Sequence, residues 1–378
     1  MEHNSLQPGD AAMLSSLLEK VKERTDNFLG YPVSKDFDYS ELVPFLQFPM
    51  NNLGDPFVDS TYAVDSREME KEVVAFFASL FRARPDDWWG YVTNGGSEGN
   101  LYGLYLAREL HPKGMVYYSS STHYSVQKNL HLLNMPNIVI RSQANGEIDY
   151  EDLQHTIRMN RHMPVIILAN AGTTMTEAKD DVARIRQILK DMAIQHCYIH
   201  VDGALSGTIN AFLDPRPAFD FADGADSIAI SGHKFIGSPM PTGVVVARKS
   251  HRDRIARSVA YIGSVDTTIT GSRNGHSPLF LWYAIKKMGM EGFRRRVAHS
   301  LETAAYAEQR LKEVGFDAWR NPNAITVMFP EAPAAVRARW QLASENGLSH
   351  VICMPNVTRQ QIDSMVAEMV AAEALVAV

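Results

Sequence analysis

Residues 229–248 read Ala-Ile-Ser-Gly-His-Lys-Phe-Ile-Gly-Ser-Pro-Met-Pro-Thr-Gly-Val-Val-Val-Ala-Arg, two apolar runs separated by a turn. The turn holds a single lysine, Lys234, among closely spaced glycines and prolines: Gly232, Gly237, Pro239, Pro241 and Gly243. This composition is typical of a tight turn lined by backbone groups. We therefore expect Lys234 at the end of a strand inside a pocket, rather than as a solvated surface charge.

Short apolar runs alternate with helical segments on both sides of this turn, from residue 90 onward. The apolar runs are 115–118, 138–140, 165–169, 198–201, 227–230 and 243–247. The helical segments between them are 97–110, 124–134, 149–160 and 178–193. This alternation predicts an α/β fold with a mainly parallel sheet covered by helices, in which ligands bind at the carboxyl ends of the strands.

The two ends of the chain have a different pattern. Residues 11–29 and 66–83 have apolar positions at helical spacing, and an irregular arm joins them. The C-terminal part predicts a helix over 278–314 broken near Gly289, then a strand at 324–329, a helix at 334–345, a strand at 349–353 and a helix at 359–375. We expect three parts, which are an N-terminal helix and arm (1–62), a large domain (63–277) and a small α+β domain (278–378).

Composition narrows the class of protein. The chain has 378 residues, a formal net charge of −6 and no basic patch, which argues against a nucleic-acid partner. The N-terminus lacks the pattern of a signal peptide, and no apolar run is long enough to cross a bilayer. Cys197 and Cys353 form no CxxC pair, and no HExxH spacing occurs. We expect a cytoplasmic protein with reduced thiols and without membrane or metal partners.

A glycine-rich stretch, Thr93–Asn100, precedes a predicted helix. Free backbone N–H groups at a helix start bind anions, so Gly96 and Ser97 could cradle a phosphate. The stretch matches neither the dinucleotide fingerprint nor the P-loop. Ser97 could equally be a simple helix cap.

Two further side chains stand at the ends of predicted strands. Asp202 ends a β-branched run and is followed by Gly203-Ala204, whose small size leaves room for a flat group. Asp202 could pair with a buried cation or cap a helix. His123 could stack on a flat ligand or play a structural part.

Lys234 itself is flanked by Ser231 and His233, which could bind an anion. A lysine amine becomes a useful nucleophile when burial or a nearby cation lowers its pKa. A lysine for a Schiff base, an acid, a stacking residue and a phosphate cradle together make the site that pyridoxal phosphate requires.

The chain resembles the pyridoxal-phosphate-dependent group II amino-acid decarboxylases, most closely the histidine decarboxylases of bacteria and the serine decarboxylases of plants. The resemblance covers nearly the whole chain and is strongest in 89–96, 122–126, 145–149, 231–234 and 270–276. It implies fold-type I of these enzymes, which is like that of aspartate aminotransferase. It also implies a homodimer with a shared active site.

The resemblance implies a role for each candidate residue. Lys234 would form the Schiff base, Asp202 would pair with the ring nitrogen, and His123 would stack on the ring opposite Ala204. The phosphate would be held by Gly96, Ser97, Ser231 and His233. Thr173 would approach the ring substituents. Ser272, in the loop 271–275, would reach the partner's cofactor, and Tyr261 or His123 would return a proton to Cα.

The reaction implied is α-decarboxylation of a polar L-amino acid, either L-histidine to histamine or L-serine to ethanolamine. Asn51–Phe57 is more like the serine enzymes, whereas Gly237-Ser238-Pro239 and Trp319–Asn323 are more like the histidine enzymes. Transamination is the alternative reaction, for which Arg320 could clamp the α-carboxylate. A cofactor-binding protein without catalysis is the alternative from another class.

Overall fold

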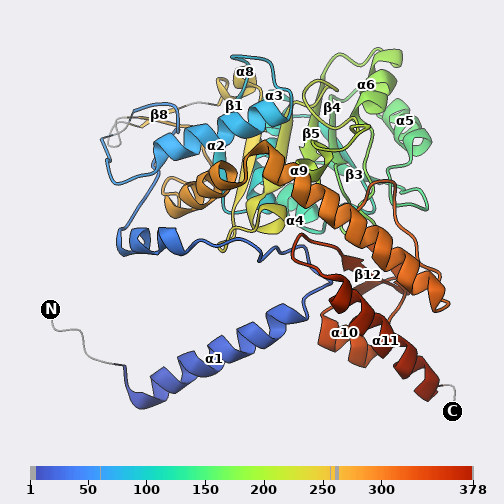
Figure 1. Ribbon diagram of the computed structural model, residues 1–378. Helices are drawn as coiled ribbons and strands as arrows, with labels where there is room; N and C mark the ends of the chain where they lie inside the picture. Colours follow the sequence, from blue (N-terminus) through green and yellow to red (C-terminus); the bar gives the residue numbers. More distant parts are fainter. Residues whose placement is uncertain (1–5, 60, 256, 260–263, 377–378) are drawn as a thin grey trace.

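The computed structural model describes residues 6–59, 61–255, 257–259 and 264–376 (Figure 1). Its centre is a seven-stranded sheet in the order β1-β7-β6-β5-β4-β2-β3. The strands are β1 Trp89–Thr93, β2 Met115–Ser119, β3 Asn137–Ile140, β4 Val165–Asn170, β5 Cys197–Asp202, β6 Ser227–Ser231 and β7 Gly243–Ala247. Strands β2 to β6 pair in parallel, and β7 is antiparallel to both β6 and β1. The predicted α/β class with a mainly parallel sheet is confirmed.

Alternating side chains of these strands enter two separate cores, because successive residues of a strand point to opposite faces. Ile166 and Tyr198 pack on one face under α3 (Gly96–Leu110) and α4 (Ser125–Leu132). Their neighbours Ile167 and Ile199 pack on the other face. That face is covered by α2 Arg67–Leu80, α5 Tyr150–Met159, α6 Val182–Asp191 and α9 His276–Glu313.

The edge strand β1 is absent from the predicted set. Its glycine, Gly90, weakens the strand pattern, since glycine is unfavourable inside strands. The structure needs glycine there, because a Cβ on Gly90 would lie 2.2 Å from the carbonyl oxygen of Val245 on β7. A close backbone approach therefore explains why the sequence pattern is weak.

A smaller sheet follows, in the order β10-β12-β11. Its strands are β10 Thr326–Pro330, β11 Ala343–Glu345 and β12 Leu348–Ile352. It packs with α9, α10 (Ala334–Trp340) and α11 (Arg359–Val376), which lie together in Figure 1. The predicted break in the long helix is confirmed, because Gly289 has φ 56° and ψ 177° inside α9. The predicted domain limits at residues 62 and 277 stay a prediction.

The expected helix over 334–345 is wrong in its second half. Helix α10 ends at Trp340, and Gln341 takes a left-handed conformation with φ 51°. Asn346 and Gly347 both have positive φ and form a two-residue turn that pairs β11 with β12. An Asn-Gly pair is the strongest short hairpin signal, and here it overrides the helical pattern before it.

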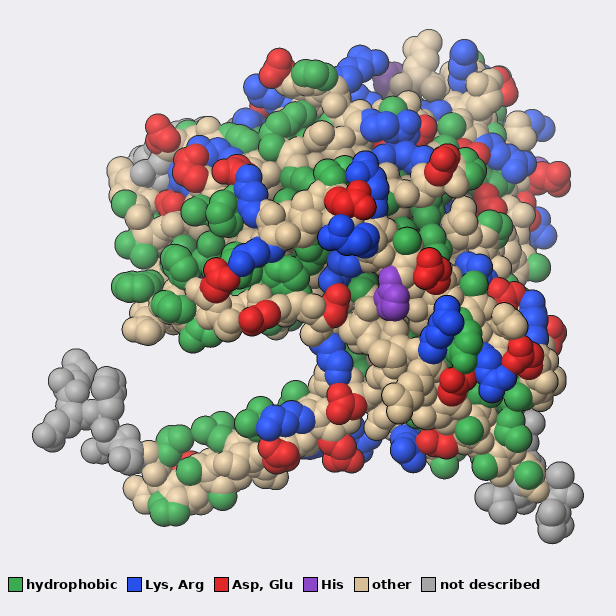
Figure 2. Space-filling model, viewed as in Figure 1, with side chains coloured by type: hydrophobic (Ala, Val, Ile, Leu, Met, Phe, Trp, Pro, Cys, Tyr) green, Lys and Arg blue, Asp and Glu red, His purple; other side chains and the backbone are tan. Residues whose placement is uncertain are grey.

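The N-terminal helix α1 (Pro8–Asp26) stands away from the rest of the molecule, and none of its residues is buried. Figure 2 shows it as a separate arm with hydrophobic side chains along it and open space toward the body. The remaining short elements are the 3-10 helix η1 Ser40–Gln47, α7 Gly207–Asn210, α8 Lys249–Arg252 and the hairpin β8 Arg257–Val259 with β9 Ser264–Asp266. Within the described residues, no helix combines the length and apolarity needed to cross a membrane.

Candidate active site

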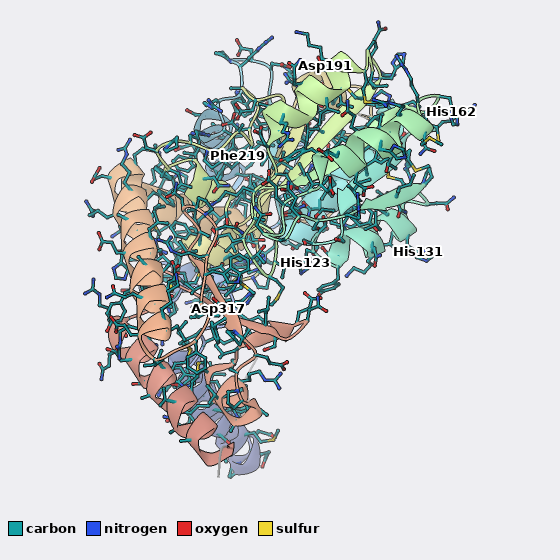
Figure 3. All side chains as sticks on the ribbon, turned by 90° about the vertical axis from the view of Figure 1, so that its right-hand side faces the viewer. His123, His131, His162, Asp191, Phe219 and Asp317 are labelled. Atoms are coloured by element: carbon teal, nitrogen blue, oxygen red, sulfur yellow. The ribbon has the colours of Figure 1, made fainter. Side chains whose placement is uncertain are left out.

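A pocket of about 1030 Å³ lies at the carboxyl ends of the parallel strands, where the sequence places the candidate residues. The start of α3, the segment after β2, the loop after β4 and the end of β5 form its walls, together with the turn after β6. The small sheet adds His350 and Ile352 on the opposite side. Figure 3 shows His123 toward the middle of the molecule, whereas His131 and His162 lie at its rim.

Lys234 lies on a single π-helical turn, η2 (Gly232–Ile236), directly after β6. The turn ends at Gly237 in a left-handed conformation, as the glycine-rich sequence predicts. Lys234 makes no hydrogen bond or ion pair with any residue that the structure describes. Burial lowers the pKa of its ammonium group, and the charge of Asp202 opposes this in part. The pocket therefore favours the neutral, nucleophilic amine.

Asp202 ends β5 and is buried beside the pocket. Its Oδ1 accepts a hydrogen bond from the N–H of Ala204 at 3.0 Å, and its Oδ2 accepts one from Nδ2 of Asn100 at 2.6 Å. The alternative role as a helix cap is wrong, because α7 begins after Ser206. Both partners of this carboxylate are neutral, so its negative charge is left for a cation in the pocket.

The residues of the predicted phosphate cradle come together where the first turn of α3 meets the end of β6. The N–H of Gly96 donates to Oγ of Ser231 at 3.2 Å. A Cβ on Gly96 would lie 2.8 Å from that Oγ and 2.9 Å from Cβ of Ala204, so only glycine fits between them. Ser97 follows in the first helical turn, and it is not the cap, since Gly95 occupies that position. His233 lines the same end of the pocket.

His123 enters the pocket from the segment between β2 and α4. Its Nδ1 lies 2.8 Å from Oγ of Ser125 and 3.3 Å from the backbone nitrogen of the same serine. A backbone N–H can only donate, so Nδ1 accepts and the neutral ring carries its proton on Nε2. Burial lowers the pKa of His123, against the opposing charge of Asp202, and this keeps the ring neutral.

Thr173 and Ala204 also line the pocket, as expected. The hydroxyl of Thr173 accepts a hydrogen bond from the N–H of Ala178 at 2.9 Å, which fixes the loop after β4. The four sequence stretches are thus brought together at one site. Among the described residues, no group of three or more His, Cys, Asp or Glu side chains is placed to hold a metal ion.

Two candidates of the sequence, Ser272 and Arg320, lie outside this pocket. Ser272 does not line this pocket, and its Oγ accepts a hydrogen bond from Nδ2 of Asn51 at 3.2 Å. Arg320 binds Glu308 and the carbonyl of Ala324 outside the pocket, so it is not placed to clamp a ligand carboxylate here. Tyr261 falls outside the described residues.

Sequence reasoning missed two polar residues next to Asp202, which are Asn100 in the lining of the pocket and His200 behind it. Asn100 lies one helical turn after Gly96, and His200 lies two residues before Asp202 on β5. These spacings place Asn100 on the face of Gly96 and His200 on the face of Asp202. Helix and strand periodicity, applied outward from the predicted site, would have found both.

The residues fit pyridoxal phosphate by their chemistry. A free lysine amine, a buried carboxylate with neutral partners and a cradle that admits only glycine provide for an aldehyde, a basic ring nitrogen and a phosphate. The pocket also has a neutral imidazole, His123, which can lie against a flat ring.

Comparison with known proteins agrees with this chemistry. The family model described as pyridoxal-dependent decarboxylase conserved domain matches residues 57–329. The chain is 50% identical to a histidine decarboxylase of Mesorhizobium japonicum, over 96% of this chain and 98% of the relative. It is 46% identical to a histidine decarboxylase of Acinetobacter baumannii, over 97% and 96% of the two chains.

Solved structures show the same fold. L-Methionine decarboxylase from Streptomyces superposes with a TM-score of 0.89 at 26% identity, covering 97% of this chain and 96% of that chain. Glutamate decarboxylase from Lactobacillus brevis superposes with a TM-score of 0.81 at 18% identity, covering 99% and 92% of the two chains. The second likeness concerns the fold alone.

Proposed function

Because the chain belongs to the pyridoxal-dependent decarboxylase family, we propose that it converts L-histidine to histamine and CO₂. It is a pyridoxal-phosphate-dependent amino-acid decarboxylase. The single observation that supports the catalytic assignment is the unpaired amine of Lys234 in a pocket that also holds the carboxylate of Asp202. The choice of histidine rests on the relatives that share about half of the chain's residues.

The residues of the pocket would hold the cofactor at three points. Lys234 would bind its aldehyde carbon, and Asp202 would pair with its ring nitrogen. Gly96, Ser97, Ser231 and His233 would bind the phosphate. When bound, pyridoxal phosphate supplies an electron sink for the electron pair that is released as the Cα–carboxylate bond breaks. Asp202 would help to keep that ring nitrogen protonated, which would strengthen the sink.

The residues that line the pocket favour decarboxylation of the amino-acid substrate over transamination, in which the substrate keeps its α-carboxylate. Among the described lining residues there is no arginine, and Lys234 is the single lysine. A transaminase typically holds the α-carboxylate with a bidentate arginine, whereas here no guanidinium stabilises the charged carboxylate. A carboxylate with few compensating charges is easier to convert to neutral CO₂. This supports decarboxylation over the alternative transamination.

A proton must return to Cα after CO₂ leaves, and we assign this step to His123. Its Nε2 carries a proton at the pocket, and Nδ1 would take up another proton as Nε2 gives its own to Cα, so that the ring ends the step neutral. Tyr261 stays the second candidate from the sequence. His123→Phe keeps a flat ring but no proton, so a variant that loses turnover while it still binds cofactor supports His123.

We also propose that the enzyme is a cytoplasmic homodimer. Helix α1 exposes more than half of each of five large apolar side chains: Met13, Leu14, Leu17, Leu18 and Val21. Exposed apolar surface of this extent marks an interaction site, and a second copy would cover it. The loop 271–275 would then reach the partner's pocket with Ser272. Two free cysteines suit a reducing compartment.

The substrate is tested by incubating the enzyme and pyridoxal phosphate with L-histidine and, separately, with L-serine. We expect histamine and CO₂ in equal amounts from L-histidine, and no ethanolamine from L-serine above the rate of the Lys234→Ala variant. Ethanolamine as the main amine would assign serine instead. Accumulation of pyridoxamine phosphate without CO₂ would support transamination. Light scattering of the eluted protein measures the dimer.

A further inference from the structure

We propose that Asn100 and His200 are positioning residues that hold the carboxylate of Asp202 ionised and directed at the cofactor ring. They belong to a network of buried hydrogen bonds that runs from Tyr198 to Asp202, which we call the Asp202 network. No step of the reaction passes through this network. It acts on the charge and orientation of Asp202, the acid proposed to face the ring nitrogen.

The Asp202 network consists of four hydrogen bonds. The hydroxyl of Tyr198 donates to Oγ of Ser227 at 2.8 Å, and that oxygen lies 2.7 Å from Nδ1 of His200. Nε2 of His200 lies 3.0 Å from Oδ1 of Asn100, whose Nδ2 donates to Oδ2 of Asp202 at 2.6 Å. All five side chains are buried. Strand β5, strand β6 and helix α3 thus meet in one polar line.

The direction of every proton follows from the last bond. An ionised carboxylate only accepts, so Asn100 must turn its NH₂ toward Asp202 and its oxygen toward His200. Nε2 of His200 must then carry a proton, which leaves Nδ1 as an acceptor for the hydroxyl of Ser227. Each donor therefore points toward Asp202, and aligned hydrogen bonds of this kind strengthen one another.

The Asp202 network stabilises the anionic carboxylate of Asp202 by hydrogen bonds, without a cation that would neutralise it. Burial lowers the pKa of His200 to about 4, against the opposing charge of Asp202, so His200 is neutral near pH 7. A direct contact between a histidine and Asp202 could share a proton between them. The amide of Asn100 transmits a dipole but no proton. Asp202 thus gains a hydrogen bond from Asn100 without gaining a counter-ion.

Helix α3 is built for this contact. A Cβ on Gly103 would lie 2.1 Å from Nδ1 of His200, so a residue other than glycine would push α3 away from β5. Asn100 stands one turn before Gly103, and Gly96 stands one turn earlier again. The same helix thus carries the phosphate cradle at its start and the partner of Asp202 one turn later, which fixes the distance between them.

The test compares two ligands, pyridoxal phosphate and its 1-deaza analogue, in which a C–H group replaces the ring nitrogen. The inference rests on the proposed pairing of Asp202 with that nitrogen. The wild-type enzyme should therefore bind pyridoxal phosphate more tightly than the analogue. Equal affinities in the wild type would refute the pairing itself. A wild-type preference that survives in the variants would refute only the role of Asn100 and His200.

We expect Asn100→Leu to reduce the affinity ratio by about ten- to a hundredfold, the effect of one hydrogen bond to a charged group. His200→Leu should reduce it less, and Ser227→Ala least, because each lies one bond further from Asp202. This gradient is not expected from general destabilisation. If Asn100→Leu does not fold, the other two variants still test the order. An unchanged ratio in all folded variants would overturn the proposal.

The matched control is Asn129→Leu. Asn129 is buried like Asn100, and its Nδ2 donates to the carbonyl of Ser97 at 2.9 Å beside the phosphate cradle. Loss of this hydrogen bond should weaken the binding of both ligands equally, and the ratio of the two affinities should stay unchanged. A ratio that falls equally in Asn129→Leu and Asn100→Leu would mean that any buried asparagine near the site has this effect, and would contradict a specific role for Asn100.

Discussion

Two buried carboxylates of this enzyme have opposite surroundings, Asp202 in the active site and Glu70 on α2. Each accepts a hydrogen bond from an asparagine amide, Asn100 in the first case and Asn52 in the second, at 2.6 and 2.7 Å. Each also accepts one from a backbone N–H. They differ in one partner, because Glu70 also binds the guanidinium of Arg273.

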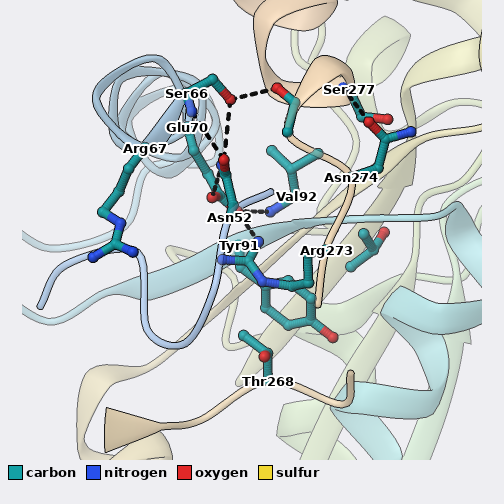
Figure 4. A network of polar contacts seen from close by, with 12 residues as sticks. Asn52, Ser66, Arg67, Glu70, Tyr91, Val92, Thr268, Arg273, Asn274 and Ser277 are labelled. Atoms are coloured by element: carbon teal, nitrogen blue, oxygen red, sulfur yellow. Dashed lines mark hydrogen bonds and ion pairs between the residues drawn. The ribbon is translucent and has the colours of Figure 1, made fainter. Parts of the chain in front are cut away.

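The Glu70 carboxylate has its counter-ion within the protein (Figure 4). Arg273 donates to Glu70 and, at 3.0 Å, to the carbonyl of Gly54, and its guanidinium lies over the ring of Tyr91 at 5.3 Å. The N–H of Val92 donates to the same carboxylate at 2.8 Å. The network joins the N-terminal arm, α2, β1 and the loop 271–275, so it holds four segments together.

The difference teaches how a buried acid becomes a binding site. Glu70 is paired with the cation Arg273, so its charge helps to hold the fold together. Asp202 has neutral partners, and the nearby lysine, Lys234, makes no ion pair among the described residues. A buried charge without a counter-ion is costly, and a ligand of opposite charge removes that cost on binding. The active site is therefore where the protein leaves a buried acid without a counter-ion.

Replacing the unpaired lysine, Lys234, should have the largest effect. We expect Lys234→Ala to lower turnover by about 10⁴-fold or more, equal to about 5.5 kcal/mol, because the nucleophilic amine is lost. The matched control is Lys179→Ala. Nζ of Lys179 is already used, since it donates to the carbonyls of Pro322 and Asn323 at 3.1 and 3.0 Å. Lys179→Ala should keep most of its turnover, and equal losses in the two variants would break the distinction between paired and unpaired lysines.

Neutralising the unpaired acid comes next. Asp202→Asn keeps the shape of the side chain but removes the anion, and we expect turnover to fall by about 10³-fold, or about 4 kcal/mol. The affinity for pyridoxal phosphate should fall in parallel, while unfolding by urea changes little. A variant that retains more than about a tenth of wild-type turnover would show that the ring nitrogen does not need this charge.

The equivalent change in the paired network should affect stability instead. Glu70→Gln leaves Arg273 buried without its anion, and we expect the free energy of unfolding in urea to fall by about 3 kcal/mol. Turnover per folded subunit should change less than in Asp202→Asn. The double variant Glu70→Gln/Arg273→Met should recover part of the loss, since it removes the orphaned charge. No recovery would mean that the pair contributes through its shape rather than its charge.

The same contrast explains what the sequence could and could not predict. Lys234, Asp202 and Gly96 stand at strand ends or at a helix start, where local pattern identifies them. Glu70 and Arg273 are separated by 203 residues and meet only through the tertiary fold, so no local pattern relates them. Asn100 and His200 are an intermediate case, because periodicity places each on the face of a predicted residue but does not show that the two side chains meet. Most elements of the large sheet were predictable from apolar runs, whereas the glycine-containing β1 and the hairpin strand β11 were not.

The smallest effect concerns the stability of the folded protein at acid pH. The buried, neutral His200 of the hydrogen-bond network next to Asp202 should make the protein less stable as the pH falls. The pKa of His200 is about 4 in the folded protein and 6.5 ordinarily, so below pH 6.5 the unfolded state binds more protons than the folded state. The free energy of unfolding therefore falls as the pH falls, by about 2 kcal/mol at pH 5 from this group alone. The free energy of unfolding of His200→Leu, measured in urea, should fall less between pH 7 and pH 5 than that of the wild type.

The control is His162→Leu, at the exposed rim in Figure 3, which also removes an imidazole but should keep the wild-type decline in the free energy of unfolding. An unchanged decline in His200→Leu would mean that His200 binds its proton equally well in the folded and unfolded states, and would contradict a neutral imidazole at this position.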